Sequence, residues 1–424
     1  GGRMADVYGR RRVFLSGLTL FTISSLVAGL AGSGGLLIGS RAIQGVGAAL
    51  LMPTTLAIIM AAFRTPRERN SAIGIWTAIG ALALGLGPVV GGLISEHLHW
   101  GWIFLINVPV GIITFAIALR SVRESRADLT SRQLDMAGLT TSALALFALT
   151  YALIEGSDRG WTSTPIVAAF AIAAAGLAAF LVIEARAKQP MMDLSTFRIR
   201  QFSGGSATMM IWAFGILGIY FFTSLYLQGV LGFSPVKAGL SFVPMALSLV
   251  VAAGVAPRLE ARIGTHRAVA LGMLMMAVAL VLILPLGATA GFGSFMPGFV
   301  VFGFGAGFMN VPLTNGILHA IPQERAGVVS ALLNNSREVA GLLGITVIGA
   351  VLRAAQAHSL RGGATPAHAF LYGYHTGLYV TIGLLAAGVL VSYLTLRSRT
   401  GADRTGPDRT APDRTGPGRI GAGV

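Results

Sequence analysis

Twelve apolar segments, each long enough to cross a lipid bilayer, constrain this 424-residue chain more than any other feature. A membrane-spanning helix needs about 20 mostly apolar residues, and tilt absorbs the extra length of longer segments. Runs this long lack the alternating hydropathy of barrel strands, and in lipid the backbone must satisfy its own hydrogen bonds. The sequence therefore predicts an all-α, polytopic membrane helical bundle. Its spans are expected at 13–31, 36–62, 71–95, 101–120, 134–154, 164–183, 202–229, 238–256, 268–288, 293–319, 327–352 and 374–396.

Composition supports a membrane protein and excludes several kinds of site. Charged residues make up only 11% of the chain, whereas soluble domains have about 25%. The absence of cysteine excludes disulfides, thiolate metal sites and a cysteine nucleophile. The net charge of +15 does not call for nucleic acid, because Lys and Arg collect in the loops on one side of a bilayer.

The distribution of basic residues predicts the orientation of the chain. Of 31 Lys and Arg residues, 25 fall in loops or ends on one side of the predicted spans and 4 on the other. This asymmetry predicts that both chain ends lie in the cytoplasm of a cell in whose plasma membrane the protein resides. The stretch 398–424 repeats Asp-Arg-Thr with Gly, Ala and Pro, and is expected to be a disordered cytoplasmic tail. It is expected to be an extension without function, with contact to anionic lipid as the alternative.

Three motifs carry a resemblance to a known transporter family. The first stretch, GRMADVYGRRR, resembles the loop signature G-x-L-A-D-x-x-G-R-R/K of the major facilitator superfamily. RAIQGVGAAL at 41–50 is similar to its fourth-helix signature, and GLGPVVGGLI at 85–94 to its fifth-helix antiporter signature. Other stretches, at 102–111, 134–139 and 324–344, resemble the fourteen-helix drug:proton antiporter branch.

The resemblance implies a fold and a division into domains. The loop signature joins helices two and three in that family, so the twelve spans are expected to be helices three to fourteen of an N-terminally truncated major facilitator fold. The implied units are the remainder of an N-terminal bundle at 1–120, a central helix pair at 121–184, a six-helix bundle at 185–397 and the tail at 398–424.

The resemblance also assigns roles to motif residues. It implies a conformational-switch loop, a proton-coupling group and an antiporter motif. The switch loop comprises Gly2, Asp6, Gly9, Arg10 and Arg11, the proton-coupling group Arg41, Gln44 and Gly45, and the antiporter motif Gly87, Pro88, Gly91 and Gly92. The acid that carries the proton is expected on the first helix of the family. In the second half, the equivalent loop has Ala261 where the signature acid would sit, which leaves charge pairing there open.

Polar and aromatic residues inside the predicted spans are candidates for a substrate cavity. An arginine at a helix centre costs about 2.5–3.5 kcal/mol on insertion scales, so Arg41 is expected to face a cavity or a partner, although snorkelling to the interface is an alternative. The asparagines could instead form ordinary interhelical hydrogen bonds. The candidates for the cavity are Trp212, Tyr220, Tyr226, Asn310, Asn315, Asn334, Arg337 and Glu338.

These features lead to a predicted function and two alternatives. The prediction is a monomeric secondary efflux transporter, not an enzyme, that exchanges protons for amphiphilic drugs by alternating access. No Walker A motif, metal-ligand spacing or hydrolase constellation is present, so neither cofactor nor metal is expected. The alternatives are a proton-coupled uptake symporter of the same fold and a non-transporting membrane receptor or scaffold. Against these stand the antiporter motif and the buried charges.

Overall fold

The protein is helical wherever the computed structural model describes it. The described residues are 1–63, 65–126, 135–187, 197–319 and 326–397. Within them no strand is present, and the all-α prediction is confirmed. The predicted tail at 398–424 lies outside the described residues.

The helices coincide with the predicted spans. Eleven helical segments among the described residues are long and apolar enough to cross a membrane, and the twelfth predicted span, 71–95, lies within the 32-residue helix α4. The first part of the chain contains α1 (Gly2–Tyr8), α2 (Arg10–Gly29), α3 (Gly34–Ala62), α4 (Pro66–His97), α5 (Trp102–Leu105) and α6 (Asn107–Ser121). The central pair is α7 (Met136–Arg159) and α8 (Thr164–Arg186). The last part contains α9 (Arg200–Leu225), η2 (Tyr226–Val230), α10 (Pro235–Ser241), α11 (Val243–Ile263), α12 (Thr265–Ile283), η3 (Phe292–Phe295), α13 (Met296–His319), α14 (Ala326–Arg361) and α15 (Pro366–Thr395).

Polar caps set where several of these helices begin. The hydroxyl of Thr65 accepts a hydrogen bond from the Glu68 N–H, and the Asp135 carboxylate accepts one from the Gly138 N–H at 2.7 Å. Each cap satisfies one of the backbone donors that a helix leaves free at its N-terminus. These caps place the helix starts within a few residues of the predicted ends of the spans.

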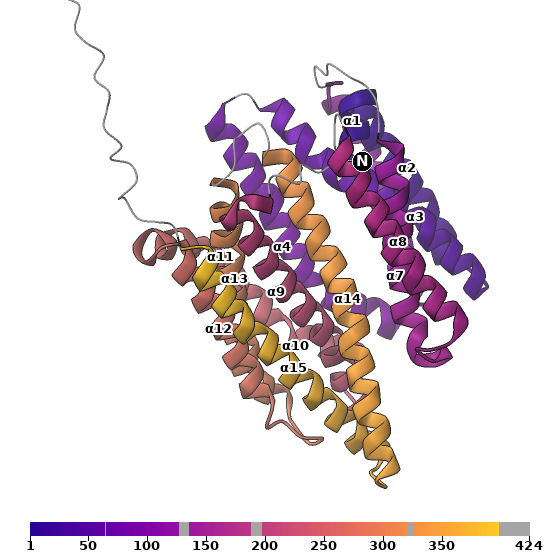
Figure 1. The fold of residues 1–424 in the computed structure, drawn as a ribbon, viewed down its shortest axis with the longest axis vertical. Coiled ribbons are helices and arrows are strands. Elements are labelled where there is room, and N and C mark those ends of the chain that lie inside the picture. Colours follow the sequence, from indigo (N-terminus) through magenta and orange to yellow (C-terminus); the bar gives the residue numbers. More distant parts are fainter. Residues whose placement is uncertain (64, 127–134, 188–196, 320–325, 398–424) are drawn as a thin grey trace, which may run out of the picture.

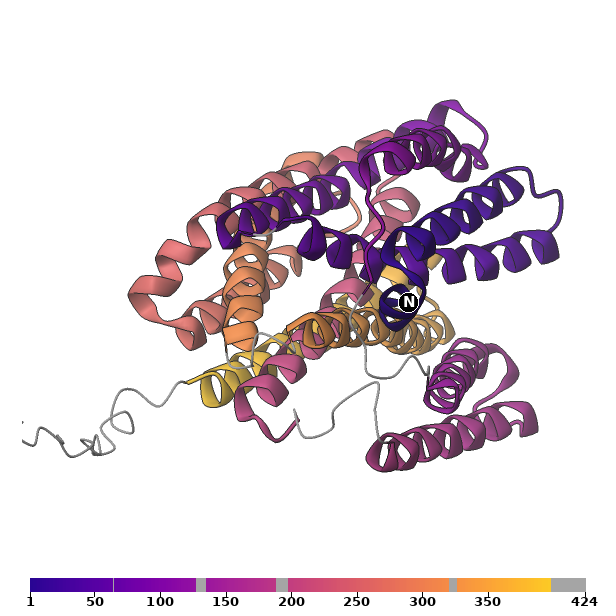
Figure 2. The same cartoon turned by 90° about the horizontal axis from the view of Figure 1, so that it is seen from above.

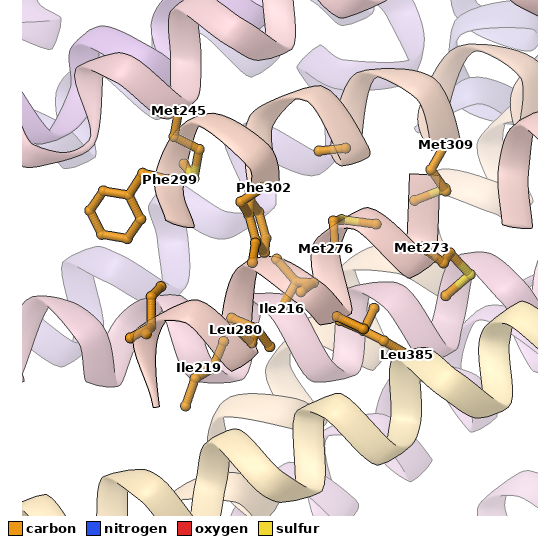
Figure 3. Packing of buried hydrophobic residues seen from close by; sticks show 14 of the residues in the cluster. Ile216, Ile219, Met245, Met273, Met276, Leu280, Phe299, Phe302, Met309 and Leu385 are labelled. Carbon is orange, nitrogen blue, oxygen red and sulfur yellow. The ribbon is translucent and has the colours of Figure 1, made fainter. Parts of the chain in front are cut away.

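The core of the molecule lies in the second half, which we define as α9 to α15. Its buried side chains form one apolar cluster, and methionines from several helices meet inside it (Figure 3). Met273 and Met276 of α12 and Met309 of α13 are fully buried there. Unbranched methionines fill irregular gaps between helices well, which suits a bundle whose helices cross at different angles.

The first half, which we define as α1 to α6, divides its contacts. Helices α2, α3 and α6 pack together, whereas α4 packs chiefly on α10 and α11 of the second half. In Figure 1 α2 and α3 lie at the right-hand side and α4 runs behind the second half, and Figure 2 shows the pair α7 and α8 as a separate layer. Helix α4 therefore connects the two halves, and the candidate site lies beside it.

Candidate functional site: a cavity between the two halves

A cavity of about 540 Å³ lies where α4 of the first half meets α9, α10 and α14 of the second. Three of the predicted site residues line it together: Pro88, Tyr220 and Glu338. Its complete lining is Pro88, Leu217, Tyr220, Phe221, Ser224, Phe242, Glu338, Gly341, Leu342 and Ile345. The cavity is thus mostly apolar, with few polar groups, as expected of a small-molecule site.

Aromatic rings form one wall of the cavity. Tyr220 of α9 lies against Phe242, which ends α10, with ring centroids 4.5 Å apart. Phe242 in turn stacks on Phe299 of α13 at 5.2 Å. Offset and tilted aromatic pairs of this kind stabilise one another, so this wall is held in place by the core behind it.

Glu338 is the only carboxylate among the described residues that line the cavity. Its side chain is 66% exposed, and Oε1 accepts a hydrogen bond from Arg337 Nη2 at 2.7 Å. Adjacent residues on a helix point about 100° apart, so the long arginine side chain must bend round to reach its neighbour. The pair therefore places a charge-compensated carboxylate at the cavity wall.

Close contact between α4 and α10 bounds the cavity at one end. A Cβ added to Gly92 would lie 2.4 Å from the Pro235 carbonyl oxygen, and one added to Gly239 would lie 2.3 Å from the Pro88 carbonyl oxygen. Only glycine permits such an approach of two backbones. We call this contact, formed by Pro88 and Gly92 with Pro235 and Gly239, the α4–α10 seam. By contrast, no described atom lies within 4 Å of a Cβ added to Gly87 or to Gly91.

The predicted proton-coupling residues form a chain of hydrogen bonds in the first half. Arg41 Nη1 donates to the Gln44 amide oxygen, and the Gln44 amide nitrogen donates to the Ser25 hydroxyl of α2, each at 2.5 Å. Gln44 and Ser25 are buried, whereas Arg41 is exposed and its guanidinium lies 5.4 Å from the Phe104 ring centroid. No Asp or Glu of the described residues forms an ion pair with Arg41, and Gly45 faces open space. The structure thus orients Arg41 but does not place it in the cavity.

The predicted switch loop is held by an acid that the sequence did not single out. Asp6 pairs with Arg10 at 3.0 Å, and Gly9 turns the chain with φ 111°, a conformation that favours glycine. The Arg11 N–H donates to Glu124 Oε1 at 3.1 Å, and the Arg11 guanidinium donates to the Leu119 carbonyl at 2.6 Å. Glu124 follows α6, so the loop is tied to the end of that helix. Gly2 begins α1, against Pro53 of α3.

The second half contains a matching arrangement with a shifted acid. Gly264 also turns with positive φ, 84°, and the preceding Glu260 accepts a hydrogen bond from the Thr265 hydroxyl at 2.7 Å. Asn315 Nδ2 of α13 lies 3.5 Å from the other carboxylate oxygen. The acid of this turn is thus Glu260, one position before Ala261, and its carboxylate contacts Thr265 and Asn315.

Four further candidates lie away from the cavity lining. Tyr226 is fully buried, stacks on Tyr374 at 4.9 Å, and donates to the Gly287 carbonyl at 2.7 Å. Trp212 packs against the core cluster, and its indole nitrogen is buried without a hydrogen-bond partner among the described residues. Asn310 donates to the carbonyl of Ala306 on its own helix. Asn334 lies in α14, and its side chain is outside the part that the structure describes.

A larger groove of about 720 Å³ lies between α2, α3 and α6. The described residues that line it are aliphatic, aromatic, glycine, serine or threonine, and none is ionisable. Ser24 and Ser40 in its wall donate to carbonyls of their own helices. The groove therefore lacks the convergent polar groups of a specific site, and the cavity between the halves remains the candidate.

The fold and its motifs agree with the family that the sequence matches. A family profile described as the Major Facilitator Superfamily covers residues 1–345. The chain belongs to the Major Facilitator Superfamily. The eleven candidate spans make this superfamily member a multi-pass membrane protein.

Curated relatives of this superfamily member are named for drug resistance and export. The multidrug resistance protein Stp of Mycobacterium tuberculosis is 35% identical over 351 residues, which are 83% of this chain and 65% of that protein. The tetracenomycin C resistance and export protein of Streptomyces glaucescens is 33% identical with the same coverage. The methylenomycin A resistance protein of Streptomyces coelicolor is 34% identical over 83% of this chain and 74% of its own length. The chain thus spans 65% of the length of the first two of these relatives.

Solved transporter structures share the fold. A bacterial homologue of the human lysosomal transporter Spinster, in an inward-facing and unoccupied conformation, aligns with a TM-score of 0.64 at 16% identity over 93% of this chain and 85% of that one. An auto-inhibited peptide transporter of the POT family aligns with a TM-score of 0.64 at 12% identity, over 93% and 83%. At such identities the likeness concerns the fold alone.

Proposed function

We propose that this superfamily member is a secondary efflux transporter that exchanges protons for amphiphilic small molecules by alternating access. The observation that carries the proposal is the cavity between the halves, which is lined by Pro88 of α4 on one side and by α9, Phe242 and α14 of the second half on the other. A cavity lined by both halves changes its access when one half moves against the other. Relatives named for multidrug resistance and antibiotic export support the direction of transport and the kind of substrate.

The lining of the cavity favours substrates with an apolar body and a positive charge. The rings of Tyr220, Phe221 and Phe242 offer apolar surface and π faces to a cation. Glu338 adds a carboxylate, which an ammonium or phosphonium group can approach when Arg337 moves aside. Uncharged amphiphiles would bind through the rings alone. The proposed substrates are therefore amphiphilic, with lipophilic cations bound most tightly.

Proton coupling is assigned to the network around Arg41. A guanidinium within about 4–6 Å of a carboxylate lowers its pKa by about 1–3 units, whereas burial alone raises it. Gln44 and Ser25 hold the arginine in one orientation, ready for an acid that approaches during transport. In this proposal Arg41 keeps that acid able to release its proton at cytoplasmic pH.

The proposal also states in which membrane the protein resides and how many chains form the transporter. The excess of Lys and Arg on one side of the spans supports cytoplasmic chain ends in a plasma membrane. Because the cavity is built by helices of one chain, a monomer contains the complete proposed site. Lipid contacts the many exposed apolar side chains, of which Ile38 and Phe147 are more than 70% exposed.

Reconstitution tests the proposal. The purified chain is placed in liposomes with an acidic lumen, and tetraphenylphosphonium, a lipophilic cation, is added outside. Antiport predicts that the probe accumulates in the lumen more than in protein-free liposomes as protons leave, and that electroneutral collapse of the pH gradient by nigericin in potassium buffer abolishes this excess. An uptake symporter would move the probe outward with the protons, and a receptor or scaffold would move none, so either result would overturn the proposal.

A further inference from the structure

One acidic side chain joins the two halves beyond the α4–α10 seam. Pro88, Gly92 and Glu96 follow one another at intervals of four residues, so they lie on one face of α4. The first two form the seam with Pro235 and Gly239 of α10. Glu96, one turn further, accepts a hydrogen bond from the Val236 N–H through Oε2 at 3.0 Å. The contact spans 140 residues in the sequence and connects the two halves directly.

The contact with Glu96 satisfies a backbone N–H donor at the start of α10. A helix leaves its first N–H groups without partners in the helix. Pro235 at the first position has no N–H, the Lys237 N–H donates to the Ser234 hydroxyl, and the Ala238 N–H donates to the Ser234 carbonyl. The Val236 N–H is the remaining donor, and the partner recorded for it in the described structure is Glu96. The first half of the molecule thus supplies the acceptor for the donor at the start of α10 that Ser234 does not satisfy.

Titration of Glu96 follows from the same contact. The Val236 N–H, and after it the Ser234 hydroxyl, hold the pKa of Glu96 below the ordinary range of a glutamate. His97, the next residue on α4, lowers this pKa further through its charge, and Lys237 on α10 places its Nζ 4.1 Å from the Phe233 ring centroid. Because the pKa is lowered in the joined state, the contact is at full strength above the pKa of a free glutamate and is lost as the pH falls from there through the lowered pKa of Glu96.

We propose that Glu96 is a positioning residue that latches α4 to α10 and thereby holds the cavity closed at this end. Pro88 lies two turns before Glu96 and lines the cavity, so the latch is directly beyond the cavity wall. The distribution of basic residues predicts that this end of α4 faces outward. The inference rests on the proposed function, because a latch of this kind has a role only if the halves part and rejoin.

Distances between two spin labels test the latch without any transport. The chain contains no cysteine, so labels attach only where cysteines are introduced. Leu93 on α4 and Leu240 on α10 are suitable positions, because their side chains are 46% and 43% exposed and their helices form the seam. Glu96→Ala removes the acceptor, and Glu96→Gln keeps a weaker, uncharged acceptor. Glu155→Gln is the matched control, since Glu155 pairs with Arg159 on its own helix at 2.6 Å, away from the α4–α10 seam.

The latch predicts a smaller population at the short distance in both Glu96 variants. An exposed ionic contact of this kind changes the ratio of joined to parted states by about two- to fivefold. In the unsubstituted chain that ratio should stay constant from pH 7 to about pH 5 and fall between about pH 5 and pH 3, whereas Glu96→Gln should respond less and Glu155→Gln should match the unsubstituted chain. Unchanged distances in Glu96→Ala, or equal pH responses with and without Glu96, would overturn the latch. If the distances respond but reconstituted chain moves no probe, the latch stands and the proposed function fails.

Discussion

A single methyl group at Gly92 should force α4 away from α10. The Cβ of Gly92→Ala would lie 2.4 Å from the Pro235 carbonyl oxygen, 2.8 Å from its carbonyl carbon and 3.1 Å from Val236 Cα. All three are backbone atoms, which cannot rotate out of the way. Ordinary contact begins at 3.4 Å, and 3.4 minus 2.4 leaves 1.0 Å of separation that the helices must make up. Overpacking of this kind costs about 1–3 kcal/mol.

The matched control for this prediction is Gly91→Ala, in the same motif and one residue away. Its Cβ would meet no described atom within 4 Å, and alanine is the better helix former. In thermal unfolding of the purified protein in detergent, Gly92→Ala should have a clearly lower midpoint than the unsubstituted chain. Gly91→Ala should have an equal or higher midpoint. Equal midpoints for the two variants would refute the close contact at the seam.

Three further predictions concern charged residues. Arg41→Lys keeps the charge but loses the planar guanidinium that binds Gln44, so proton-driven uptake of tetraphenylphosphonium into liposomes should fall while movement of the probe down its own gradient persists. Normal proton-driven uptake by this variant would argue against a role of Arg41 in proton coupling. Glu124→Ala removes the acceptor for the Arg11 N–H, so hydrogen exchange at this amide, measured by mass spectrometry, should speed up about three- to tenfold. An unchanged exchange rate would argue against the hydrogen bond between Glu124 and the switch loop. Glu338→Gln should weaken binding of tetraphenylphosphonium about two- to fivefold in equilibrium dialysis but leave an uncharged amphiphile unaffected; equal effects on both would exclude charge recognition.

Much of the fold could be predicted because hydropathy alone positions helices in lipid. Each predicted span has a helix in the structure, yet the ends differ where polar residues continue a helix. Helix α14 runs to Arg361, whereas its span was expected to end at 352, because charged and polar residues at an interface can remain helical. What hydropathy could not predict is that α4 packs chiefly on α10 and α11 of the second half.

The candidate site was only partly predictable. Pro88 was a candidate through the antiporter motif, and Tyr220 and Glu338 were candidates as aromatic or charged residues inside spans. The structure brings the three to one cavity. Tyr226 was an equally good candidate by residue type, but its hydroxyl is satisfied by the carbonyls of Leu286 and Gly287 in the core. Burial and hydrogen-bond partners, which decide between such residues, depend on how helices pack and not on local sequence.

Three acidic residues at helix ends were not recognised as structural contacts from the sequence, for a related reason. Glu124 and Glu96 look like ordinary polar residues beside a span, and the residues that they bind are 113 and 140 positions away. Glu260 was overlooked because it lies one position before the expected acid, although its longer side chain reaches Thr265. A search of the loops between predicted spans for acids close to a glycine would have found Glu260, but no local pattern marks the other two.

Binding of a lipophilic cation to the cavity between the halves is the most direct test of the central claim. Tetraphenylphosphonium binding to the purified chain would be measured by equilibrium dialysis for Tyr220→Ala and for the control Tyr379→Ala. Tyr220 lines the cavity, whereas Tyr379 on α15 is 64% exposed and does not. Loss of an aromatic wall should weaken binding about tenfold in Tyr220→Ala and leave Tyr379→Ala unchanged. Undiminished binding by Tyr220→Ala would place the substrate site elsewhere and contradict the account.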